Sequence, residues 1–590
     1  MTATRRSKAR PDEPRAKKRV RKVAAAVGAP KPEAGEARGF AERVVDAIPG
    51  PNPFVGFSVF DVLSSAEQLV AGALQQPGLV LRNQAAFAGD LARILSGRST
   101  LEPEEGDRRF QDPTWKENPF YRAGLQTYLA WRKGVHRLVE GAGLDAKGTE
   151  RARFVASLMT EALAPTNFFL GNPAAIKRAL ETGGGSLLRG LANLFDDVAT
   201  NGGMPSQVDK SAFRVGENLA STPGAVVFRN EVLEVIQYAP AGAQVYGRPL
   251  LLVPPQINKY YVIDLSPGKS LVEYAVASGI QFFAVSWRNP TVAERDWGLE
   301  TYLLALSEAI DAVCEITGSE RVNTLAACAG GITLMLLLSY LAAEGDRRVN
   351  SVTLLVTLLD TEAEGVLGLF ASEEAVALAK LNSWTKGVLP GEELGRVFAW
   401  LRPNDLVWNY WVNNYLLGNA PPAFDVLYWN NDTTRLPARL HGEFLDLFLL
   451  NPFRNPDALE LLGKPIDVAN VSCDAYVVAG TTDHITPWKT CYATTQLLTG
   501  EREFVLSSSG HIQSIVNPPG NPKARFLTNP SFPADPDDWA AGATPHTGSW
   551  WEHWTDWLAT RSGERKAAPK SLGSERHQPL AAAPGTYVHG

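Results

Sequence analysis

Three side chains in this sequence have the types needed for nucleophilic catalysis through a covalent intermediate: Cys328, Asp483 and His511. In such a set the thiolate attacks, the histidine is its base and the carboxylate orients the histidine. Cys328 follows the apolar run 322–327, lies in the small-residue turn Ala-Ala-Cys-Ala-Gly-Gly and precedes an apolar helix expected at 332–343. By itself, a cysteine in such a turn is often only a small core residue, so the assignment depends on its partners.

The two expected partners each follow a short apolar run typical of a buried strand. These runs are 475–478, before Asp483, and 503–506, before His511. Because the carboxyl ends of parallel strands meet at one edge of a sheet, both side chains are expected to converge on the nucleophile. His484 is the alternative base, but it adjoins Asp483 and cannot easily bond that carboxylate while facing the nucleophile. We therefore predict His511 as the base and a loop-stabilising hydrogen bond for His484.

A tetrahedral intermediate needs N–H donors beside the nucleophile. The backbone N–H of Ala329, directly after Cys328, is the first candidate, and it begins a helix whose dipole also favours a thiolate. The second donor is expected from the backbone of Gln256 or Ile257 in the segment 254–261. The alternative for this segment is a proline-rich turn that packs two tyrosines.

The pattern of apolar residues predicts strands that alternate with helices after residue 204, and hence a mostly parallel sheet with helices on both faces. The expected strands lie at 225–238 (as two strands), 249–253, 281–287, 322–327, 349–356, 475–478 and 503–506. Nucleophile, acid and histidine follow one another in the order of the α/β-hydrolase fold. The predicted fold class is α/β: an α/β-hydrolase fold with an inserted lid and a mainly helical N-terminal domain.

Composition and periodicity divide the chain into six parts. Helices are expected at 62–75, 83–95, 119–138 and 149–163. The aromatic-rich gap after residue 361 is too long for a simple crossover and predicts a lid over the site. The predicted parts are a disordered basic tail (1–40), a helical N-terminal domain (41–215), the first part of the hydrolase core (216–361), the lid (362–470), the second part of the core (471–562) and a C-terminal tail (563–590).

Charge and cysteine usage limit the class of protein. Residues 1–22 hold ten Lys and Arg against two acidic residues, a net charge of +8, without the apolar segment of a secretory signal. A solvated tail is expected there, with weak binding to an anionic polymer or lipid as the alternative. Four widely spaced cysteines exclude a disulfide scaffold and indicate a reducing cytoplasm. The sequence has no P-loop, dinucleotide or metal-ligand motif, so we expect no metal, no cofactor and no nucleic acid partner.

The use of cysteine in place of serine bears on the acceptor of the acyl group. A cysteine thioester is close in energy to a CoA thioester, so it keeps the energy needed to form an ester with an alcohol. The residues therefore indicate acyl transfer from a thioester to a hydroxyl group, in a site from which an aromatic lid excludes water. A thioesterase or polyester depolymerase, with water as acceptor, is the first alternative. A non-catalytic granule-coating protein is the second.

Long motifs from residue 110 onward resemble the polyhydroxyalkanoate (PHA) synthases, the single-subunit class I and II members and most closely class II. The motifs are DPTWKENPFY (112–121), PPQINKYY (254–261), SWRNP (286–290), ACAGG (327–331), YWNNDTTRLP (428–437), DHITPW (483–488) and GHIQSIVNPP (510–519). Ala326 departs from the family, whose nucleophile box normally begins with glycine. This small change should tighten the turn slightly without abolishing it.

The resemblance implies polymerisation of (R)-3-hydroxyacyl-CoA into polyester, with CoA released as part of the substrate and not retained as a cofactor. It implies Cys328 as the acyl-carrying nucleophile, His511 as its base and Asp483 as the catalytic carboxylate. Whether Asp483 orients His511 or acts directly on the hydroxyl group stays open. The implied partners are the growing polyester chain, the surface of a cytoplasmic storage granule, other granule-associated proteins and a second copy of the chain in a homodimer.

Overall fold

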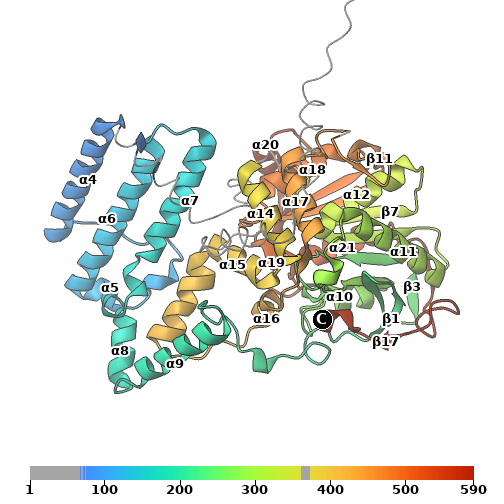
Figure 1. Ribbon diagram of the computed structural model, residues 1–590, viewed down its shortest axis with the longest axis horizontal. Coiled ribbons are helices and arrows are strands. Elements are labelled where there is room, and N and C mark those ends of the chain that lie inside the picture. The colour runs from blue at the N-terminus through green and yellow to red at the C-terminus, as the bar shows by residue number, and fades with distance from the viewer. Residues whose placement is uncertain (1–66, 68–70, 73–74, 361–372, 457) are drawn as a thin grey trace, which may run out of the picture.

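The computed structural model describes residues 67, 71–72, 75–360, 373–456 and 458–590. Its centre is an eleven-stranded sheet (Figure 1). In spatial order the strands are β15 (Thr544–Thr547), β14 (Arg525–Thr528), β13 (Arg502–Ser507), β12 (Asp474–Gly480), β7 (Val349–Leu355), β6 (Val322–Ala327), β4 (Leu250–Val253), β5 (Phe282–Trp287), β2 (Leu233–Tyr238), β1 (Gly224–Arg229) and β17 (Ala581–Ala582). The strands from β13 to β5 pair in parallel, and those outside them pair antiparallel.

Each strand predicted from the sequence is present. Parallel strands that are covered on both faces appear as continuous apolar runs, and every position of β4, β5 and β6 is buried. The chain adds β5 on one side of β4 and then returns to place β6 on the other side. This reversal creates a switch point at the carboxyl ends of β4 and β6, where open α/β sheets bind their ligands. The predicted α/β-hydrolase architecture is confirmed.

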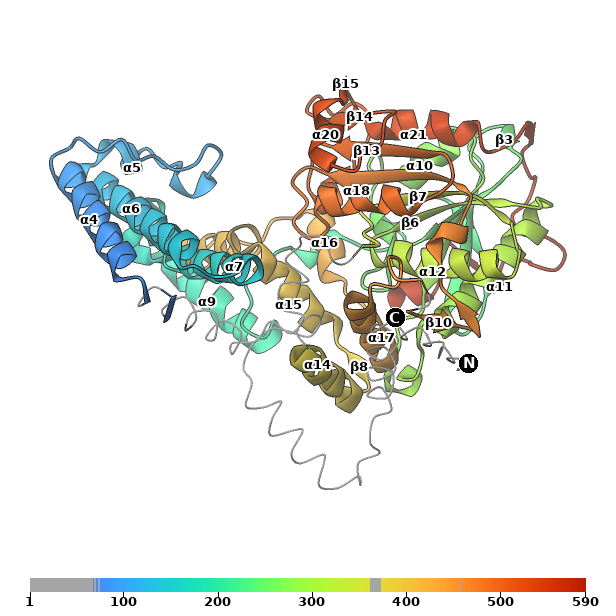
Figure 2. The ribbon, with the colours of Figure 1, turned by 90° about the horizontal axis from the view of Figure 1, so that it is seen from above.

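Helices cover both faces of the sheet (Figures 1 and 2). One face carries α11 (Leu299–Thr317), α12 (Ala329–Ala343) and α18 (Trp488–Leu497), and the other carries α10 (Leu271–Ala277) and α21 (Trp550–Ala559). Side chains of successive strand residues alternate between the two resulting cores. The tryptophans of α21, namely Trp550, Trp551 and Trp554, are buried against the second face.

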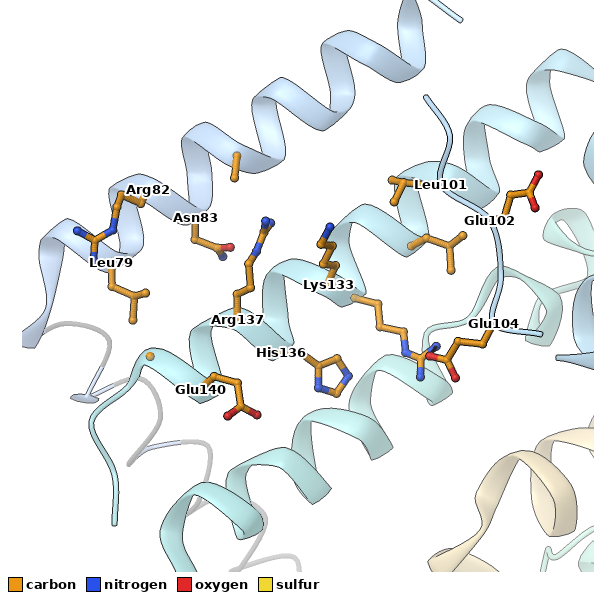
Figure 3. A pocket seen from close by; sticks show the side chains of 14 residues that line it. Leu79, Arg82, Asn83, Leu101, Glu102, Glu104, Lys133, His136, Arg137 and Glu140 are labelled. Carbon is orange, nitrogen blue, oxygen red and sulfur yellow. Dashed lines mark ion pairs between the residues drawn. The ribbon is translucent and has the colours of Figure 1, made fainter. Parts of the chain in front are cut away.

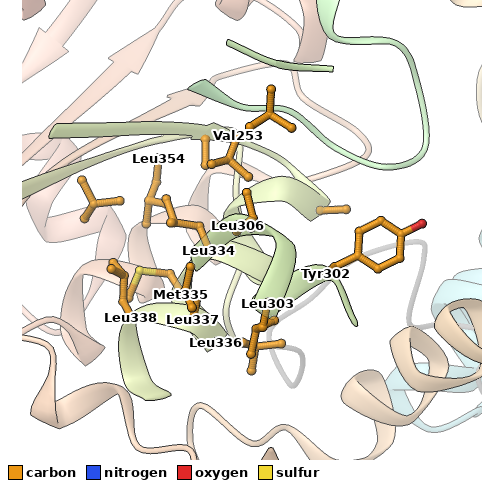
Figure 4. Close-up of a cluster of buried hydrophobic side chains, with 14 of the residues drawn as sticks. Val253, Tyr302, Leu303, Leu306, Leu334, Met335, Leu336, Leu337, Leu338 and Leu354 are labelled. Atoms are coloured by element: carbon orange, nitrogen blue, oxygen red, sulfur yellow. The ribbon is translucent and has the colours of Figure 1, made fainter. Parts of the chain in front are cut away.

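Helix α12 lies at the centre of the first core. In Figure 4, Leu334 and Met335 of α12 lie among Leu303 and Leu306 of α11 and Leu354 of β7. The helix is apolar around its whole circumference because it is enclosed on all sides. Enclosure of this helix fixes the position of its first residue, which directly follows Cys328.

The described N-terminal part is helical, as predicted. It contains α4 (Pro77–Leu95), α5 (Thr114–Glu117), α6 (Pro119–Gly141), α7 (Ala146–Ala162), α8 (Pro173–Glu181) and α9 (Gly185–Thr200). Figure 2 shows α4, α6 and α7 side by side, to one side of the sheet. Within the DPTWK motif, Trp115 is buried edge-on between Phe110 and Tyr121. The predicted tail 1–40 and most of the predicted helix 62–75 lie outside the described residues.

The segment predicted as a lid is helical and aromatic-rich in its described residues. It contains α14 (Glu373–Lys386), α15 (Gly391–Leu401), the π-helical turns η7 (Asn404–Trp408) and η8 (Trp411–Leu416), α16 (Asp425–Asn431) and α17 (Ala438–Leu450), with short strands β8 (Val388–Leu389) and β9 (Leu436–Pro437). The lid contacts the N-terminal helices through α9 and η8, where the Asn193 amide donates to the Asn414 carbonyl oxygen (2.9 Å). The positions of the domain boundaries stay predictions.

The edges of the sheet differ from the sequence-based expectation. The antiparallel strands β14, β15 and β17 lack a buried apolar run, and β15 is mostly exposed, so local pattern did not predict them. Residues 563–590, expected as a tail, return to the core: Ala582 pairs with Ala225, and the buried Glu234 carboxylate accepts the N–H groups of Thr586 and Tyr587. The small strands β16 (Arg565–Ala567) and β3 (Gln244–Tyr246) also pair, as do β10 (Glu460–Leu461) and β11 (Lys464–Pro465).

Among the described residues, no helix has the length and apolarity that crossing a bilayer requires.

Candidate active site

Cys328 occupies the sharp turn between β6 and α12, where the sequence places it. Its backbone has a φ of 50° and a ψ of −123°, which is rare for a residue other than glycine and persists only where its surroundings enforce it. The Cys328 N–H donates to the carbonyl oxygen of Leu355 in β7 (2.9 Å), which holds the turn against the neighbouring strand. A strained strand–turn–helix unit of this kind presents a nucleophile above the sheet.

The two glycines after the nucleophile are required by close packing. A Cβ atom added to Gly330 would lie 2.5 Å from the carbonyl oxygens of both Val253 and Pro254. One added to Gly331 would lie 2.2 Å from Thr357 Oγ1. Both distances are far below van der Waals contact, so α12 can begin this close to β4 and β7 only without side chains at these positions. The predicted need for small residues is confirmed.

Substitution of Gly330 by alanine should therefore destabilise the fold. The atoms that a new methyl group would meet are backbone oxygens of a central strand and its loop, which cannot rotate away. We expect the free energy of unfolding to fall by about 3 kcal/mol or more, at the upper end of overpacking effects. Urea denaturation followed by circular dichroism measures the change. Gly124→Ala in α6 is the matched control, because its Cβ would meet nothing within 4 Å, and helix propensity then favours alanine.

Asp483 and His511 form a buried hydrogen-bonded pair at the ends of β12 and β13. The Asp483 Oδ2 atom accepts a hydrogen bond from His511 Nδ1 (2.7 Å) and another from Thr486 Oγ1 (2.8 Å). Its Oδ1 atom accepts the backbone N–H groups of Ile485 and Thr486, both at 2.9 Å. These four bonds fix the carboxylate, and the carboxylate in turn fixes the imidazole ring at the start of α19 (His511–Ile515).

The charges of this pair stabilise one another. Burial alone would disfavour a cationic His511, but the Asp483 carboxylate and the contact with Cys328 outweigh it and raise the pKa of His511 to about 10. Burial also opposes ionisation of Asp483, yet His511 and the Thr486 hydrogen bonds lower the pKa of that carboxyl group. Because Nδ1 is bonded to Asp483, Nε2 is the nitrogen available to Cys328. The structure thus brings together the three side chains that the sequence singled out.

The alternative base His484 and the cysteines Cys314 and Cys473 are less suited to catalysis. Burial lowers the pKa of His484 to about 4, with Arg402 adding to the effect, and the His484 Nδ1 atom is buried without a partner among the described residues. The hydrogen bond that we expected to stabilise the loop is therefore not made by this atom. Burial raises the pKa of Cys314 to about 11 and that of Cys473 to about 12, so both thiols stay protonated near neutral pH.

The candidate oxyanion donors lie on two segments, the start of α12 and the loop after β4, which meet at the turn that holds Cys328. Ala329 supplies the first N–H group of α12, which by its position has no acceptor within the helix. The loop after β4 is tied to this helix: the buried Gln256 donates through Nε2 to Thr333 Oγ1 (3.1 Å), and Thr333 donates to the Ala329 carbonyl oxygen (3.1 Å). The roles of the Gln256 and Ile257 backbones stay predictions, while their location beside the nucleophile is as expected.

The motif YWNNDTTRLP of the lid covers the same loop. Thr434 donates a hydrogen bond to the Gln256 carbonyl oxygen (2.8 Å), and Trp429 donates to the Lys259 carbonyl oxygen (2.6 Å). Asp432 accepts from the Tyr261 hydroxyl group (2.7 Å) and forms an ion pair with Lys259 (2.8 Å). The lid therefore packs directly against the candidate oxyanion loop.

Sequence reasoning did not single out Thr486, Thr333 or Thr434. A threonine three residues after Asp483 is a local signal, because an aspartate often caps a turn whose N–H groups lie two and three residues ahead. Thr333 lies one turn after Ala329 on an otherwise apolar helix, which is also visible in the sequence. Thr434 meets the loop after β4 only through tertiary structure, and nothing local predicts that contact.

Comparison with known proteins agrees with this arrangement. A family model described as the N-terminus of poly-beta-hydroxybutyrate polymerase (PhaC) matches residues 106–275, and the model of the alpha/beta hydrolase fold matches residues 249–518. The poly(3-hydroxyalkanoate) polymerase 1 of Ectopseudomonas oleovorans is 56% identical over 92% of this chain and 96% of its own length. Polymerase 2 of the same organism is 51% identical over 91% and 96%. The poly(3-hydroxyalkanoate) polymerase subunit PhaC of Cupriavidus necator is 42% identical over 93% and 92%. The chain belongs to the poly(3-hydroxyalkanoate) polymerase family.

Proposed function

We propose that this enzyme polymerises (R)-3-hydroxyacyl-CoA into a polyester and releases CoA, with the acyl chain held on Cys328 as a thioester. The observation that carries the proposal is the buried Asp483–His511 pair beside a cysteine in a strained elbow. Membership of the family supports a polyester as the product, and the geometry supports Cys328 as the nucleophile, His511 as the base and Asp483 as the orienting carboxylate.

The first half of the cycle loads the acyl group. The Asp483 carboxylate and the contact with Cys328 raise the pKa of His511 to about 10, so His511 is a strong enough base to accept the Cys328 proton. The Cys328 sulfur attacks the thioester carbonyl, and the N–H groups of Ala329 and of the Gln256–Ile257 segment bind the resulting oxyanion. The carbon–sulfur bond to CoA then breaks. His511 gives its proton to the CoA thiolate, which leaves as the free thiol.

The second half transfers the acyl group to oxygen. His511 is now neutral and accepts the proton of the 3-hydroxyl group of the next unit. The alkoxide attacks the acyl-cysteine carbonyl, an ester bond forms, and the carbon–sulfur bond to Cys328 breaks. The proton stays on His511 beside the regenerated thiolate, so the cycle closes without net proton uptake. Four hydrogen bonds enclose Asp483, which supports an orienting role for its carboxylate over direct action on the hydroxyl group.

The site of action follows from the product. A polyester with an apolar backbone separates from water, so we propose that the enzyme works in the cytoplasm at the surface of a storage granule. Its partners there are the growing chain and other granule-associated proteins. We also propose a homodimer, which the family implies.

An assay of CoA release with isolation of the product tests the function. The class II-like motifs favour medium chains, so we expect kcat/KM for 3-hydroxydecanoyl-CoA to exceed that for 3-hydroxybutyryl-CoA by about tenfold or more. The released CoA should match ester-linked units in the polymer. Decanoyl-CoA, which lacks the 3-hydroxyl group, should release one CoA per chain and then stop. Continued release with free acid as the sole product would instead identify a thioesterase.

A further inference from the structure

A cleft of about 990 Å³ opens between α4 and α6 in the N-terminal helices (Figure 3). Its apolar lining comes from Leu79 and Ala86 of α4, Leu129 of α6 and Leu101 of the connection between them. The size and this apolar part of the lining are those of a small-molecule site, in which polar groups orient the ligand.

Most residues that line the cleft are charged or polar, and one of them is an arginine with unpaired donors. The Nε and Nη2 atoms of Arg137 are buried and have no hydrogen-bond partner among the described residues. The Oδ1 atom of Asn83, across the cleft on α4, is likewise buried without a partner. Figure 3 shows both side chains in the space between the two helices. A buried guanidinium edge without an acceptor is costly, so this edge needs an acceptor that the described residues do not supply.

Other arginines of the same chain show what this edge binds. Nε and Nη2 are the two parallel donors that grip both oxygens of a planar anion. Arg109 donates from them to the two oxygens of Asp107 (2.9 and 2.7 Å), and Arg153 donates from both to the single oxygen Oε1 of Glu140 (3.0 and 2.8 Å). Three carboxylates line the cleft: Glu140 pairs with Arg153, Glu104 pairs with Arg132, and no bond from Glu102 to Arg137 is present among the described residues. The open edge therefore lacks an anion.

We propose that the cleft binds an amphiphilic carboxylate, whose anionic head lies on Arg137 and whose acyl chain lies on the leucines of α4 and α6. The orphaned Asn83 oxygen adds an acceptor for a hydroxyl group near the head, so a 3-hydroxy acid offers a partner to each buried unpaired atom of Arg137 and Asn83. Such a head and chain occur in a free hydroxy acid and at the carboxyl end of a polyester chain. The site is distinct from Cys328 and does not depend on the proposed reaction.

Calorimetric titration of the full-length protein with (R)-3-hydroxydecanoate and with its ester-linked trimer tests this proposal. We expect one site per chain, and a Kd that rises at least about tenfold in Arg137→Gln, which loses a bidentate charged contact. Ala86→Phe, which places a ring in the cleft and leaves Arg137 in the sequence, should weaken binding as well. Arg122→Gln, on the exposed surface of α6 outside the cleft lining, is the matched control, and His511→Gln should bind like the wild type.

A comparison of the monomer, the trimer and the methyl ester shows which ligand the cleft binds. Tighter binding of the monomer identifies a free acid as the ligand, and tighter binding of the trimer identifies the end of a polymer chain; both support the site. The methyl ester of 3-hydroxydecanoate should bind at least about tenfold more weakly than the acid. Equal binding by Arg137→Gln and the wild type, equal binding of the methyl ester, or displacement by inorganic phosphate at equal concentration would each overturn the proposal.

Discussion

Replacement of Cys328 by alanine is expected to reduce CoA release to the background rate of thioester hydrolysis, a loss on the order of 10⁶ in kcat. No other described thiol can take over, because burial raises the pKa of Cys314, Cys473 and Cys491 and keeps them protonated. The fold should survive, because alanine is smaller than cysteine and the strained backbone is imposed by β6, β7 and α12. Loss of the covalent adduct, seen as the loss of one acyl group per chain by mass spectrometry, accompanies the loss of activity.

Two further variants show whether the thiol itself is needed. Cys328→Ser keeps a nucleophile but forms an oxygen ester, which has already lost the energy of the thioester. We expect this variant to accept an acyl group slowly and to transfer it hardly at all, so acylated protein should accumulate. Cys314→Ala, in α11, removes a thiol of the same chain outside the site and should leave the rate unchanged. Substantial polymer formation by Cys328→Ala would refute the covalent mechanism.

The sequence predicted those parts of the site that local pattern controls. Cys328 is bounded by a buried strand and small residues because the elbow is tight, and Asp483 and His511 follow apolar runs because parallel strands are covered on both faces. The contacts that hold these groups depend on tertiary structure. Thr434 reaches Gln256 from 178 positions away, and no periodicity encodes such a contact. The edge strands β14 and β15 were missed for a related reason: a partly exposed strand needs no apolar run.

The same distinction applies outside the site. An arginine such as Arg137 on a helix with polar neighbours is expected to be solvated, and only the packing of α4 against α6 encloses its Nε and Nη2 atoms. The C-terminal segment 563–590 shows the opposite case, in which tertiary contacts create a strand that the local sequence does not predict. Its sequence lacks the pattern of a strand, yet two alanines pair with β1 because the buried Glu234 binds the backbone that follows them.

Substitution of His511 by glutamine should lower kcat by at least about 10³-fold, since the variant can neither hold the proton of the Cys328 pair nor accept that of the hydroxyl group. Asp483→Asn should cost a similar factor, because the amide no longer stabilises the cationic ring and no longer fixes its tautomer. His577→Gln, near the C-terminus, is the control that alters a histidine outside the site. Steady-state CoA release with 3-hydroxydecanoyl-CoA measures all three variants.

The His511 variant also makes a prediction about stability that a purely structural role of the ring does not. The pKa of His511 is about 10 in the folded protein, against about 6.5 in an unfolded chain. A group whose pKa is raised by folding contributes stability that is complete below the unfolded value and is lost as the pH rises through the folded one. The difference in unfolding free energy between wild type and His511→Gln should therefore be largest near pH 6 and shrink steadily toward pH 10. Asp483 is ionised in both states over that range, so it adds no slope of its own. A difference that stays constant from pH 6 to pH 10 would show that folding does not raise the pKa of His511.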